Sequence, residues 1–118
     1  MALHNELGNT GEELAVNWLG QHGFEVIHRN WRYSYYEIDI VARKDRFLHF
    51  VEVKTRNYSR VGYPEDAVTK KKFKRLQRAA DEWLFQNPGH PWIQYNILSI
   101  ILHDVKEPEY FFIEDLFL

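Results

Sequence analysis

Three polar residues interrupt two neighbouring apolar segments of the chain, and their types could support hydrolysis of a phosphodiester. Asp39 lies in segment 37–42, and Glu52 and Lys54 lie in segment 47–56. Two adjacent carboxylates can hold a hard cation such as Mg²⁺ or Mn²⁺, which keeps several waters. A neighbouring lysine could orient the attacking water or help to deprotonate it. This combination predicts metal-assisted hydrolysis.

The two segments are predicted to pair as an antiparallel β-hairpin around a polar turn at residues 44–46. Opposed residues in such a hairpin have a constant number sum, and a turn centred there places Asp39 opposite Glu52. The Cβ atoms of opposed residues are about 4.5–5.5 Å apart. Glu52 and Lys54 are two residues apart and therefore share a face of the strand. At this spacing the carboxylates repel each other unless a cation neutralises them.

A simpler interpretation treats Glu52 and Lys54 as solvated surface residues that form a weak ion pair. Asp104 and Lys106 have the same spacing, but they lie in a predicted turn without an opposed acid. The hairpin and Asp39 distinguish the first pair from the second.

Periodicity places this hairpin within a chain of two helices and five strands, in the order αβββαββ. The first helix is predicted over residues 8–22, and the second follows Thr69 as a candidate cap and is ended by Asn87-Pro88-Gly89. The predicted strands cover residues 24–32, 37–42, 47–56, 92–102 and 110–113, with a loop over 57–64. This order indicates an α/β fold in which helices flank a mixed β-sheet. The 118 residues, 45% hydrophobic, are expected to form one domain over 1–118.

The first predicted helix adds a fourth candidate, Glu12, which borders the apolar face of that helix. A functional role is one interpretation of this acid. The other is structural, because an acid near a helix N-terminus interacts favourably with the helix dipole. A capping box formed by Thr10 and Glu13 beside it would also be structural.

The charge of the chain is unevenly distributed, although its formal net charge is only −2. Residues 1–28 carry −4, residues 29–78 carry +8 and residues 79–118 carry −6. The basic block favours a surface for a polyanion such as nucleic acid, unless these charges are scattered over the fold. The lack of cysteine excludes disulfides and thiolate ligands. No secretory signal or membrane-length apolar segment is evident, so a soluble cytoplasmic protein is expected.

Basic residues gather in the second predicted helix. Four of them, spaced at i, i+3, i+4 and i+7, form its best continuous basic face: Lys71, Lys74, Arg75 and Arg78. Lys70 and Lys72 fall at the flanks of this face. Together with Arg56, the four residues of the face are predicted to bind nucleic acid. Nearby aromatic residues are interpreted as packing or rim residues rather than as platforms on which bases stack: Tyr33, Tyr35 and Tyr36.

Several segments carry a resemblance to a known family. They are Gly8-Asn9-Thr10-Gly11-Glu12, Arg29-Asn30-Trp31-Arg32, Glu37-Ile38-Asp39-Ile40-Val41-Ala42, Phe50-Val51-Glu52-Val53-Lys54-Thr55-Arg56, the Lys72 helix and Ile113-Glu114-Asp115-Leu116-Phe117. With them the chain resembles the bacterial YraN family, which is uncharacterised and similar in fold to archaeal Holliday junction resolvases and the PD-(D/E)XK nuclease superfamily.

The resemblance implies a restriction-endonuclease-like fold and assigns roles to the candidates. The nuclease motif is matched by three residues, Asp39, Glu52 and Lys54, and the helix-borne acid of the resolvase-like branch by Glu12. The chain departs from the family pattern at two positions. Tyr36 stands where the family usually has Gly, and Asn96 stands where it usually has Asp, so position 96 is not counted as a ligand.

The leading hypothesis is therefore a nuclease-like domain that uses Mg²⁺ or Mn²⁺ to hydrolyse DNA, on branched or single-stranded substrates. Glu12, Asp39 and Glu52 would hold the metal, and Lys54 would act with Asp39 and Glu52 in catalysis. One alternative is a nucleic-acid-binding protein of the same fold that does not cleave. Another is a protein-interaction module whose basic helix meets an acidic partner. Cleavage of both strands would favour a homodimer.

Overall fold

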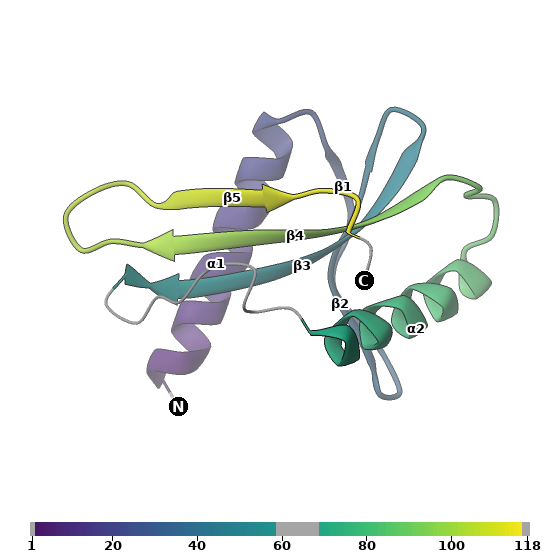
Figure 1. Ribbon diagram of the computed structural model, residues 1–118, viewed down its shortest axis with the longest axis horizontal. Helices are drawn as coiled ribbons and strands as arrows, with labels where there is room; N and C mark the ends of the chain where they lie inside the picture. The colour runs from purple at the N-terminus through teal and green to yellow at the C-terminus, as the bar shows by residue number, and fades with distance from the viewer. Residues whose placement is uncertain (1, 59–68, 117–118) are drawn as a thin grey trace.

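A five-stranded β-sheet with a helix packed on each face makes up the computed structural model of the protein, which describes residues 2–58 and 69–116 (Figure 1). Its elements are α1 (Ala2–Gln21), β1 (Glu25–Tyr33), β2 (Tyr36–Lys44), β3 (Phe47–Asn57), α2 (Lys70–Gln86), β4 (Ile93–Leu102) and β5 (Glu109–Ile113). The predicted order αβββαββ and the mixed α/β sheet are confirmed.

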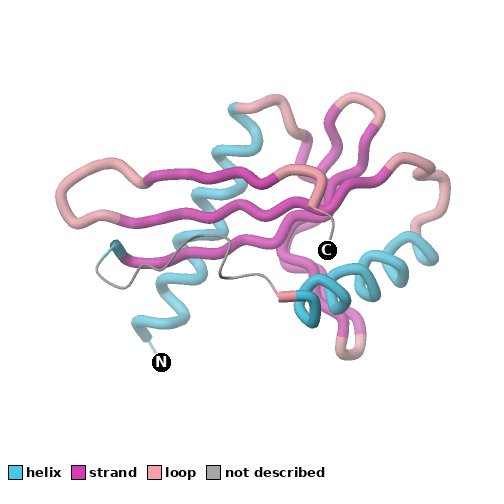
Figure 2. Tube along the Cα trace, in the orientation of Figure 1, coloured by secondary structure: helices cyan, strands magenta, loops and turns pink. Residues whose placement is uncertain are grey.

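The strands lie across the sheet in the order of the sequence, β1-β2-β3-β4-β5. β1, β2 and β3 pair antiparallel, and β5 returns antiparallel to β4. β4 is parallel to β3. The connection through α2 returns the chain to the end of the sheet at which β3 begins, so both strands run in the same direction. β3, β4 and β5 extend together to one side, whereas the β1–β2 turn projects beside the first turns of α2 (Figure 2).

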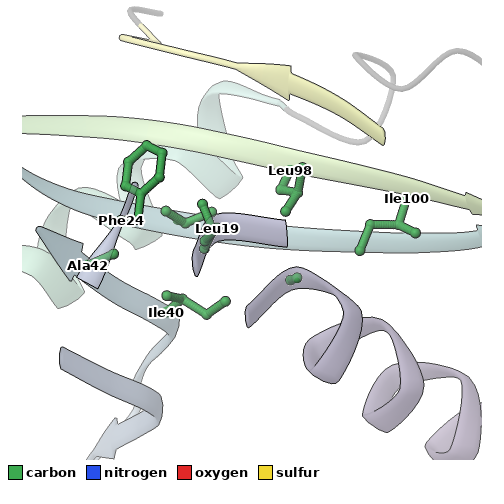
Figure 3. Packing of buried hydrophobic residues seen from close by; sticks show 8 residues of the cluster. Leu19, Phe24, Ile40, Ala42, Leu98 and Ile100 are labelled. Carbon is green, nitrogen blue, oxygen red and sulfur yellow. The ribbon is translucent and has the colours of Figure 1, made fainter. Parts of the chain in front are cut away.

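Strand alternation gives the sheet two apolar faces, and each is covered by one helix. On one face, Leu19 of α1 packs with Ile40 and Leu98 of the sheet (Figure 3). On the other face, Trp83 of α2 packs with Phe50. We call these groups the α1 cluster and the α2 cluster. They fix both helices against β2 and β3, the strands that carry the central candidate residues.

The sequence prediction is wrong about the start of α1, which begins at Ala2 rather than residue 8. The prediction relied on apolar spacing, whereas the Ala, Leu and Glu of this segment favour a helix through their intrinsic propensity. The remaining boundaries agree within two residues. Of the predicted loop, residues 59–64 lie outside the described residues. Neither α1 nor α2, the helices of the described ranges, is long and apolar enough to cross a membrane.

α1 approaches β3 closely at Gly11, a buried glycine inside the helix. A Cβ added at this position would overlap the side chain of Thr55 and lie 2.8 Å from its Cβ. We therefore expect Gly11→Ala to lower the free energy of unfolding by about 1–3 kcal/mol, the usual cost of overpacking. Urea denaturation measures this loss.

Gly20, in the same helix, is the matched control, since a Cβ added there meets nothing within 4 Å. Gly20→Ala should be neutral or stabilise the protein by up to about 1 kcal/mol through helix propensity. Equal effects of the two substitutions would contradict a close approach of α1 to β3.

Candidate functional site

The β2–β3 hairpin has the predicted register. Ile40 pairs with Val51 and Val41 pairs with Phe50, which is the alignment that would place Asp39 opposite Glu52. Regular pairing ends at Ile40 and Val51, one residue before those two acids. Beyond this point β2 curves away from β3 (Figure 1). The candidate acids therefore lie where the two strands begin to separate.

β2 loses its regular alternation at Asp39. Ile38 packs in the α2 cluster and Ile40 in the α1 cluster, although residues two apart on a regular strand share a face. The carboxylate of Asp39 accepts a hydrogen bond of 2.8 Å from the backbone N–H of Val53. This bond holds the carboxylate against β3, beside the segment that carries Glu52.

A cavity of about 620 Å³ lies between the separating strands and α2. Six of the charged side chains that line it come from three elements: Asp39 of β2, Glu52 and Lys54 of β3, and Lys72, Arg75 and Arg78 of α2. Glu52 and Lys54 continue the alternation of Leu48 and Phe50, which face α2. The structure thus brings the three central candidates together at one cavity and places cations of α2 beside them.

The carboxyl of Asp39 has a strongly perturbed proton affinity. Burial is the largest cause and raises its pKa from 3.8 to about 6, with the carboxylates of Glu52, Glu37 and Glu12 acting in the same direction. The hydrogen bond from Val53 opposes this shift. The repulsion expected between clustered carboxylates is therefore present at Asp39, and a nearby cation would relieve it.

The amine of Lys54 lies between a carboxylate and a second amine. Its Nζ is 3.5 Å from Oε2 of Glu52, and both side chains are partly buried. On the α2 side, Lys54 is close enough to lower the pKa of Lys72, while Glu52 opposes that shift. The cavity therefore holds two neighbouring lysines next to its acids.

Glu12 approaches this group from α1 but is not among the residues that line the cavity. Its carboxylate lies 3.6 Å from Arg29, which also binds Glu13 at 2.6 Å. Glu12 is near enough to raise the pKa of Asp39. Thr10 and Glu13 lie inside α1, so the capping-box alternative is wrong.

The basic residues divide into two groups. All four residues of the basic face of α2 are exposed, but only Arg75 and Arg78 line the cavity, and Lys71 and Lys74 are not among its lining residues. Arg56 lies close enough to Lys72 to contribute to the lowering of its pKa.

Lys72 is a cavity residue that sequence reasoning did not single out, because it left this lysine at the flank of a basic face. Helical spacing could have predicted its position, because Lys72 lies four residues before Leu76 and seven before Ala79, and both of these residues are buried. A lysine on the buried stripe of an amphipathic helix must direct its amine into a polar space. Here that space is the cavity.

The two positions that depart from the family pattern have different surroundings. Asn96 is fully buried, and its side chain contacts His49 at 2.7 Å and accepts a hydrogen bond from the backbone N–H of Asp115 at 2.9 Å. It therefore ties the C-terminal segment to the sheet and does not line the cavity. Tyr36 packs beside the α2 cluster and does line the cavity.

Within residues 2–58 and 69–116, no three His, Cys, Asp or Glu side chains come together in a group that could hold a metal ion. The three-acid set of Glu12, Asp39 and Glu52 therefore stays a prediction. Asp39 and Glu52 alone fit Mg²⁺ or Mn²⁺, which commonly take one or two carboxylates plus waters. The placement of these two carboxylates at one cavity is the observation that favours this fit.

Comparison with known proteins places the chain among uncharacterised bacterial proteins. The sequence model of the uncharacterised protein family UPF0102 matches residues 11–102. A UPF0102 protein of Bacteroides thetaiotaomicron is 45% identical over 101 residues, 86% of this chain and 84% of the relative. One from Syntrophomonas wolfei is 42% identical over 88% of this chain and 91% of its own length. One from Rhodococcus opacus is 38% identical over 99% of this chain and 100% of its own length.

Proposed function

The chain belongs to the uncharacterised protein family UPF0102, and from the cavity that it carries we propose a metal-dependent nuclease-like protein that hydrolyses phosphodiesters in DNA. One observation supports this proposal above all: Asp39, Glu52 and Lys54 line a single cavity with cations of α2. Acids alone would suit many cations. Acids, an amine and arginines together suit a phosphate diester, because the arginines match the charge and shape of the phosphate.

Each residue of the cavity has a distinct part in this proposal. Asp39 and Glu52 would hold the cation, and Glu12 would approach from α1 as a third acid. The cation would supply Lewis-acid stabilisation of the charge that develops on the phosphate. Lys54, 3.5 Å from Glu52, would orient the water that attacks phosphorus. Arg75 and Arg78 would hold the phosphate of the strand in the cavity.

Calorimetric titration with Mn²⁺ and with Mg²⁺ tests the metal part of the proposal. The wild-type protein should bind the cation, and Asp39→Asn should lose this binding, because a neutral amide replaces a charged ligand. Asp104→Asn is a matched control, since Asp104 is exposed and is not among the lining residues of this cavity. Equal heats of metal binding by the wild type and Asp39→Asn would show that Asp39 is not a metal ligand.

The salt dependence of DNA binding tests the role of the α2 cations. The affinity for DNA falls as salt rises, and Arg75→Gln combined with Arg78→Gln should make this dependence less steep. The magnitude of the slope of log affinity against log salt should fall by about 1.8 for duplex DNA, about 0.9 for each lost phosphate contact. Fluorescence anisotropy between low and moderate salt gives this slope. Lys71→Gln combined with Lys74→Gln removes the same charge outside the cavity and should lower the slope less. Equal reductions would show that phosphates contact the helix as a whole.

A further inference from the structure

The turn between β1 and β2 exposes aromatic rings at the edge of the cavity. Tyr35 is 98% exposed and Tyr33 is 50% exposed. Tyr33 pairs with Tyr36, so Ser34 and Tyr35 form a two-residue turn. Tyr35 lines the same cavity as Asp39 and the α2 cations. A ring that is almost fully exposed adds little to the apolar core, so its contribution to folding does not explain this placement.

The base of this turn is firmly anchored although its tip is exposed. The ring of Tyr33 stacks on Trp31, with centroids 6.3 Å apart and planes inclined by 17°. Trp31 and Tyr36 pack beside the α2 cluster. The exposed rings are thus presented from a packed scaffold, which lowers the entropy lost when a ligand stacks on them.

Cations and aromatic rings meet at this place. Arg75 and Arg78 of α2 line the cavity together with Tyr35 and Tyr36 of the turn. A basic groove that follows the backbone, beside aromatic rings on which bases stack, is how proteins bind single-stranded nucleic acid. In duplex DNA the bases are already paired and stacked within the helix, so these rings would have no free base faces to contact.

We propose that Tyr33 and Tyr35 stack on unpaired bases next to the phosphodiester held in the cavity, and so select DNA with a single-stranded segment over fully paired DNA. This inference rests on the proposed function for the identity of the bound phosphate. Arginines in the cavity hold the phosphate backbone of the DNA, and the tyrosines bind the neighbouring bases only where these are unpaired. The tyrosine turn therefore determines the structure of the substrate, and the acids perform the chemistry.

The test uses fluorescence anisotropy with two labelled probes, a 20-nucleotide oligothymidine and a 20-base-pair duplex, in EDTA so that cleavage cannot occur. Tyr33→Ala combined with Tyr35→Ala should weaken oligothymidine binding by about tenfold or more, because base stacking on an aromatic ring is worth that much. Duplex binding should change less than about twofold. The salt slope should stay unchanged, since no phosphate contact is removed.

Two further variants separate stacking from a general loss of apolar surface. Tyr35→Trp keeps a stacking ring and should retain oligothymidine affinity. Phe85→Ala removes an 82% exposed ring of α2 that is not among the cavity residues, and should leave binding of both probes unchanged. Equal affinity of the wild type and the double variant for oligothymidine would overturn the inference, as would an equal loss on the duplex.

A cleavage assay with the same probes and variants, with Mg²⁺ or Mn²⁺ in place of EDTA, distinguishes failure of this inference from failure of the proposed function. Tyrosine-dependent oligothymidine binding without cleavage in Mg²⁺ or Mn²⁺ would support the stacking role and contradict the nuclease. Cleavage of both probes with no effect of the tyrosines would support the nuclease and overturn the stacking role. Absence of salt-dependent binding of the wild type to either probe would overturn both.

Discussion

Asp39→Asn should make the metal-free protein more stable at pH 7 but not at pH 4. Burial raises the pKa of Asp39 to about 6, so the native state binds this proton more tightly than the unfolded state does. Tighter binding of this proton stabilises the native state. The stabilisation is fully present below pH 3.8, the pKa of Asp39 in the unfolded state, and it is lost as the pH rises through about 6. The wild type should therefore lose roughly 2–3 kcal/mol relative to the asparagine variant between pH 4 and pH 7.

Urea denaturation in EDTA at the two pH values measures this difference. Asparagine keeps a side-chain oxygen that can accept the hydrogen bond from Val53, so the comparison isolates the charge. Asp39→Ala is the control for the hydrogen bond and should be about 1–3 kcal/mol less stable than Asp39→Asn at both pH values, because the Val53 N–H loses its partner. A difference between the wild type and Asp39→Asn that does not change with pH would contradict a destabilised carboxylate.

Lys54→Met should reduce the rate of DNA cleavage by about 100- to 10,000-fold, the usual contribution of a group that moves or positions a proton. Methionine preserves most of the length of the side chain and removes only the amine. Binding of Mn²⁺ should persist, because Asp39 and Glu52 remain. Lys106→Met is the matched control, since Lys106 is exposed and is not among the residues that line this cavity.

Single-turnover cleavage of a labelled substrate gives the rate, and calorimetry gives the metal affinity. Lys54→Arg restores the positive charge but not an amine that releases a proton, so it should keep Mn²⁺ binding without recovering the rate. A Lys54→Met protein that cleaves as fast as the wild type would exclude a catalytic role for Lys54 and leave only its ion pair with Glu52.

The fold and the centre of the site could be predicted from the sequence, because both depend on local patterns. Alternating apolar residues and a polar turn determine the hairpin register, and the register alone brings Asp39 toward Glu52. The parallel placement of β4 follows from the helix between it and β3. None of these inferences needs knowledge of distant contacts.

Contacts between distant elements explain what the sequence prediction missed. The change of face at Asp39 is accompanied by a hydrogen bond from the backbone N–H of Val53, fourteen residues away, which apolar periodicity does not reveal. The cations of α2 that meet the cavity depend on how the helix rotates about its axis when Leu76 and Trp83 become buried. The exposure of Tyr35 depends on where the β1–β2 turn projects, which periodicity does not determine.

Cleavage of labelled DNA by the purified wild-type protein, with Asp39→Asn purified in parallel, tests the central claim most directly. The substrates are single-stranded, fully paired, splayed-arm and four-way DNA, each incubated with Mg²⁺, with Mn²⁺ or with EDTA. We predict metal-dependent products from the wild type on at least one substrate, none in EDTA and none from Asp39→Asn. Intact DNA in every wild-type reaction, or equal cleavage by Asp39→Asn, would contradict the account.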